Sequence, residues 1–542
     1  MGASASRRSR MLWGLAIGTL ALFLLLTFPV TPGSAHGDDF GCGSVDVRVS
    51  EEGGYWMQWT PAIAVGPRGT VFAVWSDPRD EPDGANSIYF SRSSDGGHTW
   101  STPNVRVSLF SESHQEDPSI AVDSEGTVYV AWRGGTTSTR LIDVWVAGST
   151  DMGATWSEPS KVNDVSGYVD ASTSFGPAIA VDAEGALYVA WMDWRNSLPD
   201  NVNPVIADPD IYVARSIDGG LSWSPNVRVN DDVGTTEQIG DPAIAVDPDG
   251  AVYIAWQDRR DDERGDVYVS GSDDGGATWS ANVRVNDVTT GFQGDPGLAA
   301  GAGGVFVAWL DGRDSAGDIY FSSSQDGGVS WSTNLRINDV QSRGTDSEPS
   351  LAVRDHTVYV AWHQDVYDNG LYQALLVRSL DDGVHWGPNL PLAEGTRAEL
   401  HPVIALDSTG TVFGAWEDER GASMDIYATS CPFADPTAQV VIGPSLGKPA
   451  AGMLSTDPRP PARMDDRPGH RTHCHGERSD DPGMTLPATS GLSTDETGST
   501  PDAIVTPGAT PSPPCFLTLL LSIVALSAFG LSLLVSRRRR RR

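Results

Sequence analysis

The sequence predicts an all-β protein, a seven-bladed β-propeller of four-stranded blades whose N-terminal strand closes the last blade, followed by a C-terminal transmembrane helix. Three observations predict this fold class. A short apolar run ends in tryptophan seven times, at spacings of 53 to 65 residues. Each repeat contains four such runs, and a 20-residue uncharged segment near the C-terminus is long enough to cross a bilayer. The seven tryptophans are Trp75, Trp132, Trp191, Trp256, Trp309, Trp362 and Trp416.

The fourth repeat shows the expected strands most clearly. It contains the runs PAIAVD, AVYIAW, DVYVSG and NVRVND, which alternate apolar and polar residues and are bounded by Gly, Asp, Pro or Asn. No helical periodicity competes with this pattern. Four strands per unit of about fifty residues are typical of propeller blades.

The last repeat lacks its fourth strand. Its three runs are Pro402–Asp407, Thr411–Trp416 and Asp425–Ser430. The segment Val45–Ser50 matches the missing run but precedes the first blade. We therefore expect the N-terminal segment to complete the seventh blade, which leaves no open sheet edge.

One turn recurs between the third and fourth runs, with the pattern Ser-x-Asp-x-Gly-x-(Thr/Ser)-Trp. Five copies are complete, and the sixth has His385 in place of Thr or Ser. In the fourth repeat, Asp274 is suited to accept backbone N–H groups of its own turn, Gly276 permits positive φ, and Trp279 is suited to pack between blades. We interpret the turn as structural. Its aspartates are Asp95, Asp151, Asp218, Asp274, Asp326 and Asp381.

These turns resemble the Asp-box (BNR) repeats of the sialidase superfamily, and the resemblance covers the whole predicted propeller. It implies that the boxes lie on the face opposite an active site, so function is expected on the loops after the second and fourth strands. The superfamily's sialidases use three arginines, an acid/base carboxylate and a Tyr–Glu pair. Their Phe/Tyr-Arg-Ile-Pro motif is replaced here by Trp59–Val65, which lacks arginine, and their ring usually has six blades. We therefore transfer no catalytic residue.

Arginines follow the second strand in five blades, two residues after an aspartate. A ring of arginines is suited to bind anions such as a sugar carboxylate. The alternative is an Asp–Arg pair that ties one blade to the next. The five candidate ligand-binding arginines are Arg79, Arg195, Arg260, Arg313 and Arg420.

Further candidates are aromatic residues and departures from the repeat. Tyr55, Trp56 and Trp59 precede the first blade and offer faces for stacking on sugars, or for packing. Catalytic residues should depart from the repeat, as do Arg133–Gly135 and the segment from His363 to Asp365, which is followed by Tyr367 and Tyr372. The catalytic residues themselves remain unknown, and we expect no metal and no cofactor.

Aligning the broken seventh turn with intact ones places Cys42 and Cys431 at the two ends of one hairpin. Such ends lie close together, so a disulfide is geometrically plausible. An extracellular location would permit it. Cys474 and Cys515 lie outside the predicted ring and are poorer partners.

The chain ends predict export and anchoring. Residues 1–35 resemble a signal peptide, with a basic start, an apolar run and small residues before position 35. Residues 36–435 form the propeller, and 436–514 form a disordered stalk rich in Pro, Gly, Thr and Ser. Residues 515–536 form the transmembrane helix, and the six arginines 537–542 are expected to be cytoplasmic.

The net charge of the chain limits the classes of partner that it can bind. The net charge is −34, and without the nine arginines of the two ends 28 basic and 71 acidic residues give −43. Phosphate binding needs a basic face, so nucleic acid is excluded as a partner. We expect a membrane-tethered extracellular propeller that binds glycans or other acidic ligands. The alternative is an exo-α-sialidase or related glycosidase with diverged motifs.

Overall fold

The computed structural model describes residues 42–433, except 43–44, 52–56, 80–84, 109–112, 137–141, 170–175, 197–208, 233–241, 262–263, 315–316, 340–346, 366–370, 394–397 and 422. The predicted signal peptide, stalk, transmembrane helix and basic tail lie outside these residues. Within the part that is described, no helix is long and apolar enough to span a bilayer.

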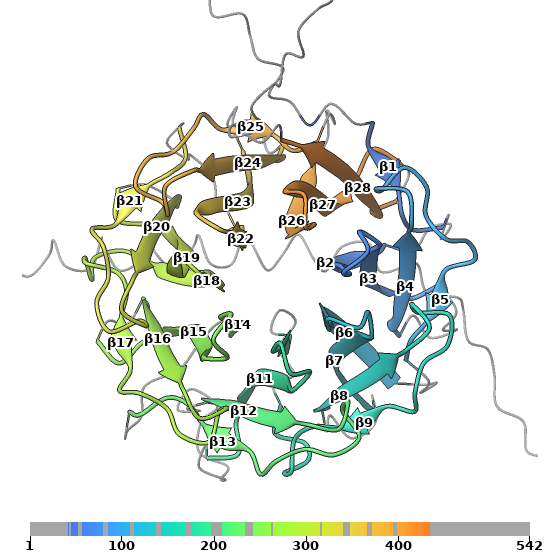
Figure 1. The fold of residues 1–542 in the computed structure, drawn as a ribbon, viewed down its shortest axis with the longest axis horizontal. Helices are drawn as coiled ribbons and strands as arrows, with labels where there is room; N and C mark the ends of the chain where they lie inside the picture. Colours follow the sequence, from blue (N-terminus) through green and yellow to red (C-terminus); the bar gives the residue numbers. More distant parts are fainter. Residues whose placement is uncertain are drawn as a thin grey trace, which may run out of the picture. The chain divides into compact units, whose positions relative to one another are not determined.

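Seven four-stranded antiparallel sheets surround a central axis, as predicted (Figure 1). Blades one to three consist of β2 (Trp59–Val65), β3 (Val71–Asp77), β4 (Ser87–Ser93) and β5 (Val105–Arg106); β6 (Ser113–Val122), β7 (Val128–Thr136), β8 (Ile142–Ser149) and β9 (Ser160–Lys161); and β10 (Ala178–Val181), β11 (Leu187–Asp193), β12 (Asp210–Ser216) and β13 (Val227–Arg228).

Blades four to six consist of β14 (Ala243–Val246), β15 (Val252–Asp258), β16 (Asp266–Ser272) and β17 (Val283–Arg284); β18 (Gln293–Gly301), β19 (Gly304–Asp311), β20 (Asp318–Ser324) and β21 (Leu335–Arg336); and β22 (Ser347–Arg354), β23 (Thr357–Gln364), β24 (Gln373–Ser379) and β25 (Leu390–Pro391). Blade seven contains β26 (Glu399–Leu406), β27 (Thr411–Asp418), β28 (Asp425–Pro432) and β1 (Val47–Arg48). In each blade the first of these strands lies nearest the axis and the fourth lies outermost (Figure 1).

The second strand of each blade carries the core. It is hydrogen-bonded on both edges and covered by neighbouring blades on both faces, so every residue of β3, β11 and β15 is buried. The repeated tryptophan on this strand is at most 1% exposed in all seven blades. In five blades its indole N–H donates to the aspartate two residues later, as Trp256 does to Asp258 at 3.0 Å. The tryptophan therefore fills the core without leaving its N–H unpaired in these blades.

The ring closes as the sequence predicts. In β1, Val47 pairs with Ala428 and Arg48 with Tyr427, so the N-terminal segment supplies the fourth strand of blade seven. A disulfide joins Cys42 and Cys431, whose Cα atoms are 4.4 Å apart. Both predictions are confirmed, and the segments that meet are 389 residues apart in sequence.

Each Asp box forms a closed hydrogen-bonded turn. In blade four, Asp274 accepts from the hydroxyl of Ser272 at 2.9 Å, the backbone N–H of Thr278 at 2.8 Å and the Thr278 hydroxyl at 2.6 Å. Gly276 has φ of 81°, and its N–H donates to the Ser272 hydroxyl. The same bonds hold Asp95, Asp151, Asp218 and Asp326, while His385 replaces the hydroxyl donor at Asp381.

The tryptophan that ends each box packs against the neighbouring blade. Trp156 of blade two lies edge-on to Phe90 of blade one, with ring centroids 5.2 Å apart. Trp386 of blade six meets Phe321 of blade five in the same way, at 4.8 Å. The boxes thus stabilise both their own hairpin and the contact between blades.

Candidate functional site

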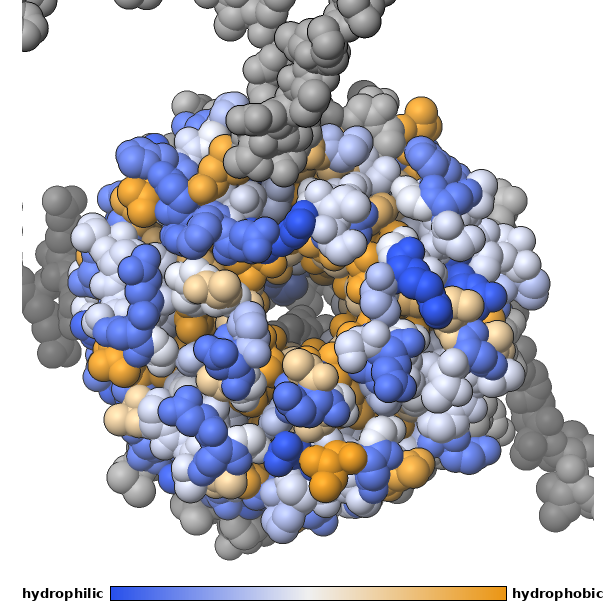
Figure 2. Space-filling model, in the orientation of Figure 1, coloured by the Kyte–Doolittle hydropathy of each residue, from blue (hydrophilic) through white to orange (hydrophobic). Residues whose placement is uncertain are grey.

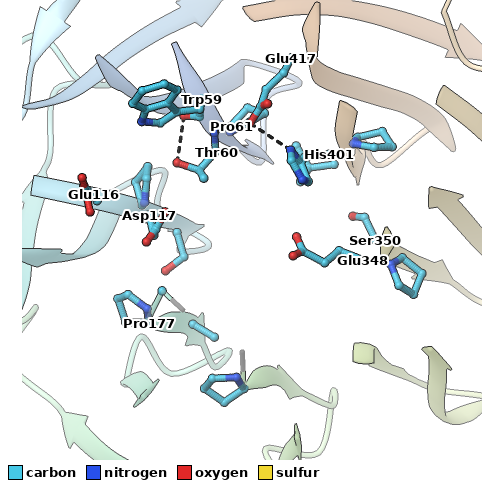
Figure 3. Close-up of a pocket in the computed structure, with 18 residues that line it drawn as sticks. Trp59, Thr60, Pro61, Glu116, Asp117, Pro177, Glu348, Ser350, His401 and Glu417 are labelled. Carbon is cyan, nitrogen blue, oxygen red and sulfur yellow. Dashed lines mark hydrogen bonds and ion pairs between the residues drawn. The ribbon is translucent and has the colours of Figure 1, made fainter. Parts of the chain in front are cut away.

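A pocket of about 710 Å³ lies on the axis of the ring, between the innermost strands (Figure 3). The surface is hollowed at this point, at the centre of the ring (Figure 2). Its described lining comes from the beginning of the first strands of blades one, two, three, six and seven, together with Pro242 before β14 and Glu417 of β27. The seven blades converge here, so one pocket is lined by side chains that are far apart in sequence.

A residue precedes a proline at the start of the first strand in all seven blades, and those of blades one, two, three, six and seven line the pocket. We call these seven residues the pre-proline ring. Five residue types occupy the seven positions, with Asp at three of them, whereas the strand that follows is nearly constant. In order they are Thr60, Asp117, Gly176, Asp241, Asp295, Glu348 and His401. Asp241 lies outside the described residues.

The backbone of the pre-proline ring is unusual. Thr60, Asp117, Asp295, Glu348 and His401 all have positive φ, between 23° and 52°. This region disfavours residues with a Cβ, and a following proline restricts the backbone further. Such strain is found at binding and catalytic sites, where the surrounding fold holds it in place.

A β-bulge produces this conformation. In the five blades with positive φ, the register between the first and second strands shifts at the pre-proline residue, as between Glu116 and Ser119 in blade two. A bulge re-aims a side chain that the regular pleat would direct elsewhere. Figure 3 shows the result, since Asp117, Glu348 and His401 all point into the pocket.

Blade three lacks a side chain at this position for a steric reason. A Cβ on Gly176 would lie 2.7 Å from the Cβ of Asp117 and 2.8 Å from its carbonyl oxygen. Glycine therefore leaves room for the Asp117 side chain of the neighbouring blade. Asp117 and the first-strand backbone of blade three are packed as one unit.

A second variable position supports the pre-proline ring from behind. It is the residue that follows the second-strand tryptophan. In blades one, two, six and seven it is polar and contacts the pre-proline ring, whereas in blades three and five it is apolar. The seven residues are Ser76, Arg133, Met192, Gln257, Leu310, His363 and Glu417.

In blade two, Arg133 holds two carboxylates. It is 2% exposed, and its guanidinium donates to Asp117 at 2.5 Å and to Glu116 at 3.0 Å. Burial raises the pKa of Asp117, and the charge and hydrogen bond of Arg133 act in the opposite direction. The predicted departure from the repeat at Arg133 therefore lies directly behind the pocket.

Blades six and seven hold a histidine and a glutamate at the pocket. His401 Nδ1 lies 3.1 Å from Glu417 Oε1, and the same oxygen accepts the backbone N–H of Thr60 at 2.7 Å. Burial lowers the pKa of His401, but the bond to Glu417 and the charges of Glu417, Glu348 and Asp117 outweigh burial and raise it to about 9. His401 is thus a cation at neutral pH.

His363 positions His401. The backbone N–H of His401 donates to His363 Nδ1 at 3.0 Å, and the two rings meet edge-on with centroids 5.3 Å apart. Burial and the charge of His401 lower the pKa of His363 to about 3, so it is neutral and accepts this bond. His363, the second residue predicted to depart from the repeat, therefore also lies behind the pocket, and Tyr372 packs against it.

Among the described residues, two carboxyl groups of the pre-proline ring have no hydrogen-bond or salt-bridge partner, namely Glu348 and Asp295. Glu348 faces pocket solvent, although protein surrounds it on nearly all sides. Burial and the charges of Glu417 and Asp117 raise its pKa, against the effect of His401. Burial and the charge of Glu348 raise the pKa of Asp295 to about 7. No described cation forms a salt bridge with either group.

The arginines predicted to bind a ligand do not line the central pocket, and each one is hydrogen-bonded to an aspartate of the protein. Arg260 donates three bonds to Asp258 and one to Asn282, and reaches Asp231 beyond the preceding blade at 2.6 Å. Its guanidinium stacks on Tyr268 at 4.5 Å. This is the inter-blade pairing named as the alternative. Arg79, Arg195, Arg313 and Arg420 make equivalent bonds to the aspartate two residues earlier and stack on the equivalent tyrosines.

The predicted aromatic residues divide between the described and undescribed parts. Tyr55, Trp56 and Tyr367 lie outside the described residues. Trp59 lines the pocket, beside Thr60 (Figure 3). Sequence reasoning missed the pre-proline ring, although its signal was present as one variable residue before an otherwise constant strand.

The fold and the repeated turns together define the class of protein, which is an Asp-box β-propeller with a pocket on its axis. Residues 206–393 match a family model described as a BNR repeat-like domain. The match covers blades four to six and part of blade three, and together with the six boxes and the seven-bladed ring it supports the resemblance to BNR-repeat β-propellers. No curated protein sequence matches it significantly.

Several solved structures are similar. A protein of unknown function from Dyadobacter fermentans DSM 18053 has 14% identity and a TM-score of 0.43, covering 71% of this chain and 97% of its own. The Hadza microbial sialidase Hz136 has 19% identity and a TM-score of 0.41, and the match covers 72% of this chain and 68% of the sialidase. A PL25 ulvan lyase has 11% identity and a TM-score of 0.49, and the match covers 71% of this chain and 96% of the lyase. At these values the likeness carries no inference about activity.

Proposed function

We propose that the protein is an extracellular, membrane-tethered propeller that binds a glycan in its central pocket. The observation that carries this proposal is the pre-proline ring, whose side chains vary between blades and are held toward the pocket by strained backbone. Variation at one position of an otherwise regular repeat is what ligand recognition requires, because a structural role would favour the same residue in every blade.

The pocket has the surface that a sugar needs. Trp59 and the ring prolines supply apolar faces for the sugar ring, while Thr60, Ser350 and the carboxylates supply hydrogen-bonding groups for hydroxyls. Pockets for small ligands typically combine an apolar lining with a few convergent polar groups. Its size, about 710 Å³, suits a short oligosaccharide end rather than a whole protein segment.

The charge of the pocket argues against an anionic ligand at this place. Its described lining contains Glu116, Asp117, Glu348 and Glu417 and no arginine or lysine, and its one cation, His401, lies against Glu417. A sialic acid carboxylate would meet like charge there, which raises the cost of binding. We therefore propose a neutral or basic glycan in preference to an acidic one.

Export and anchoring rest on the chain ends and on the disulfide. The segments 1–35 and 515–536 have the composition of a signal peptide and a transmembrane helix. The bond between Cys42 and Cys431 supports the same proposal, because disulfides persist in oxidising compartments. Protease digestion of intact cells that express a C-terminally tagged chain tests it. Protection of residues 36–435 from added protease would contradict an extracellular propeller.

A glycan array probed with the propeller segment 36–435 tests the binding. Trp59→Ala is expected to lower affinity about tenfold, which corresponds to about 1.4 kcal/mol, through loss of a stacking face. Tyr168→Ala is the control, since Tyr168 is an exposed aromatic that does not line the pocket. Absence of any bound glycan, or equal loss in the two variants, would overturn the proposal.

Glycoside hydrolysis is the second candidate, favoured by one specific observation. Glu348 and Asp117 face the pocket from opposite sides (Figure 3). A carboxyl group whose pKa is raised in a glycan pocket is suited to protonate a leaving oxygen, while a second carboxylate acts as base or nucleophile.

Fluorogenic aryl glycosides, neutral and sialylated, test this second candidate. Cleavage of a neutral glycoside that Glu348→Gln abolishes and Glu158→Gln leaves unchanged would support it. Glu158 is exposed and outside the pocket. Cleavage of the sialoside alone would instead favour a diverged sialidase. If neither substrate is cleaved, the hydrolase candidate is overturned and the glycan-binding proposal is unaffected.

A further inference from the structure

Among the described residues, the central pocket has an excess of negative charge. Five described carboxyl groups converge on it or lie beside it, and two described cations lie among them. The carboxyl groups are Glu116, Asp117, Asp295, Glu348 and Glu417, and the cations are Arg133 and His401.

The two cations are already committed to other carboxylates. Arg133 is divided between Asp117 and Glu116, at 2.5 and 3.0 Å. His401 lies 3.1 Å from Glu417. Neither forms a salt bridge with Glu348 or Asp295. The unpaired charge is therefore localised on the side of the pocket formed by blades five and six.

Glu348 is the group that indicates what is missing. Its side chain is exposed to the solvent of the pocket, and among the described residues it has no hydrogen-bond or salt-bridge partner. Its backbone φ of 23° is a conformation that a residue with a Cβ rarely adopts. A carboxylate held at such a cost without a partner is arranged for a group that arrives from outside.

A metal ion fits this arrangement poorly. Among the residues that are described, no three His, Cys, Asp or Glu side chains lie close enough to hold one ion. The carboxylates are instead spread around the wall of a pocket of about 710 Å³. An organic cation suits this spacing, because it carries its charge on a larger body that also fills the apolar part of the pocket.

We propose that the ligand of the central pocket is a glycan with a free amino group, a protonated amino sugar whose ammonium is bound by Glu348. This inference rests on the proposed glycan function and specifies its ligand class. An ammonium has three N–H donors and no acceptor, which matches a site formed by carboxylate acceptors. Trp59 and the ring prolines then contact the sugar ring.

Calorimetric titration of the full-length protein tests the proposal. The probes are a glucosamine oligosaccharide with free amines and its N-acetylated counterpart of the same length, at about pH 6, where the amines are protonated. The free-amine probe is expected to bind at least about tenfold more tightly, and added salt is expected to reduce this difference. Acetylation removes the charge and also adds an acetyl group, so the salt dependence and the Glu348→Gln variant are needed to assign the difference to the ammonium group.

Two variants locate the site. Glu348→Gln is expected to lower affinity for the free-amine probe about tenfold and to leave affinity for the acetylated probe unchanged. Glu158→Gln, an exposed acid outside the pocket, is expected to change neither. Melting curves of the variants confirm that each is folded. Asp295→Asn provides a second test of the negative charge on this side of the pocket.

The outcomes separate this inference from the function on which it rests. Equal binding of both probes overturns the amino-sugar ligand and leaves glycan binding intact. Binding of neither probe, together with a blank glycan array, overturns both. Tight binding of calcium alone, lost in Glu348→Gln, overturns the inference in favour of a metal.

Discussion

The Asp boxes and the central pocket both hold aspartates, yet the two regions treat them in opposite ways. In the boxes, the hydrogen bonds from the seventh residue of the motif and from its first serine lower the pKa of each aspartate to about 2, as at Asp274. In the pocket, burial and the charge of Glu348 raise the pKa of Asp295 to about 7. One carboxylate is fully satisfied by its own turn, and the other is satisfied by nothing in the described protein.

The difference shows how a repeat protein separates stability from function. Every box repeats the same residues because every hairpin must close in the same way. The pre-proline ring changes from Thr60 through Glu348 to His401 because its side chains face one shared pocket and not their own blade. Repetition therefore marks structure in this chain, and variation at a fixed position marks the pocket. The following predictions test this contrast, from the largest expected effect to the smallest.

The double variant Cys42→Ser/Cys431→Ser removes the covalent link that replaces an Asp box in blade seven. Because the bond closes a loop of 389 residues, its loss is expected to reduce the free energy of unfolding by about 6 kcal/mol in the chain-entropy model. Denaturant unfolding with and without reductant measures this. Non-reducing peptide mapping that finds both thiols free in the wild-type protein would contradict the premise.

Arg260→Ala tests whether the repeated arginines are structural. It leaves the fully buried Asp258 without its cation and removes the contact to Asp231 of the neighbouring connection. A loss of about 2–4 kcal/mol is expected, with ligand affinity per folded molecule unchanged. Arg68→Ala, at an exposed turn, is the control. Reduced affinity without reduced stability would restore the predicted anion-binding role.

Asp295→Asn is expected to stabilise the protein, unlike any substitution in a box. The folded pKa is about 7 and the unfolded value is 3.8, so the penalty on the folded state is absent below about pH 4, grows as the pH rises and is complete above about pH 7. Asp295 is only partly buried, so solvent reduces the penalty to about 1–2 kcal/mol. Unfolding curves at pH 8 and pH 4 measure it. A variant that is less stable than wild type at pH 8 would show that the ionised aspartate has a partner.

Asp274→Ala should give the smallest effect, a lower melting temperature with unchanged ligand binding, because it removes the bonds within one exposed turn. Its folded pKa of about 2 lies below the unfolded 3.8, so the stabilisation is present above about pH 4 and is lost as the pH falls toward 2. Wild type and variant should therefore converge in melting temperature in acid. Lost binding without lost stability would contradict the structural interpretation.

Much of the fold could be predicted because its signals repeat. Seven tryptophans, four runs per unit and the displaced segment Val45–Ser50 determined blade number and closure, and aligning the broken box identified the disulfide. Each of these signals is local or is copied many times, so chance agreement is improbable.

The pocket could be predicted only in part. Arg133 and His363 stood out as departures from the repeat, and both contact the pre-proline ring. The ring itself was missed, because a residue before proline reads as an ordinary strand start. Only the bulge turns that side chain toward the axis, and only closure of the ring brings Asp117 of blade two opposite Glu348 of blade six.

The disulfide at the meeting of β1 and β28 also determines how the protein bears mechanical load. A force applied through the chain beyond Phe433 reaches Cys431 before it reaches the remaining strands of blade seven, and the bond passes it to Cys42 at the beginning of the ring. The two-residue pairing of β1 with β28 is bypassed. A pull from that end is therefore carried by a covalent loop of seven blades, which cannot be peeled open strand by strand while the bond is intact.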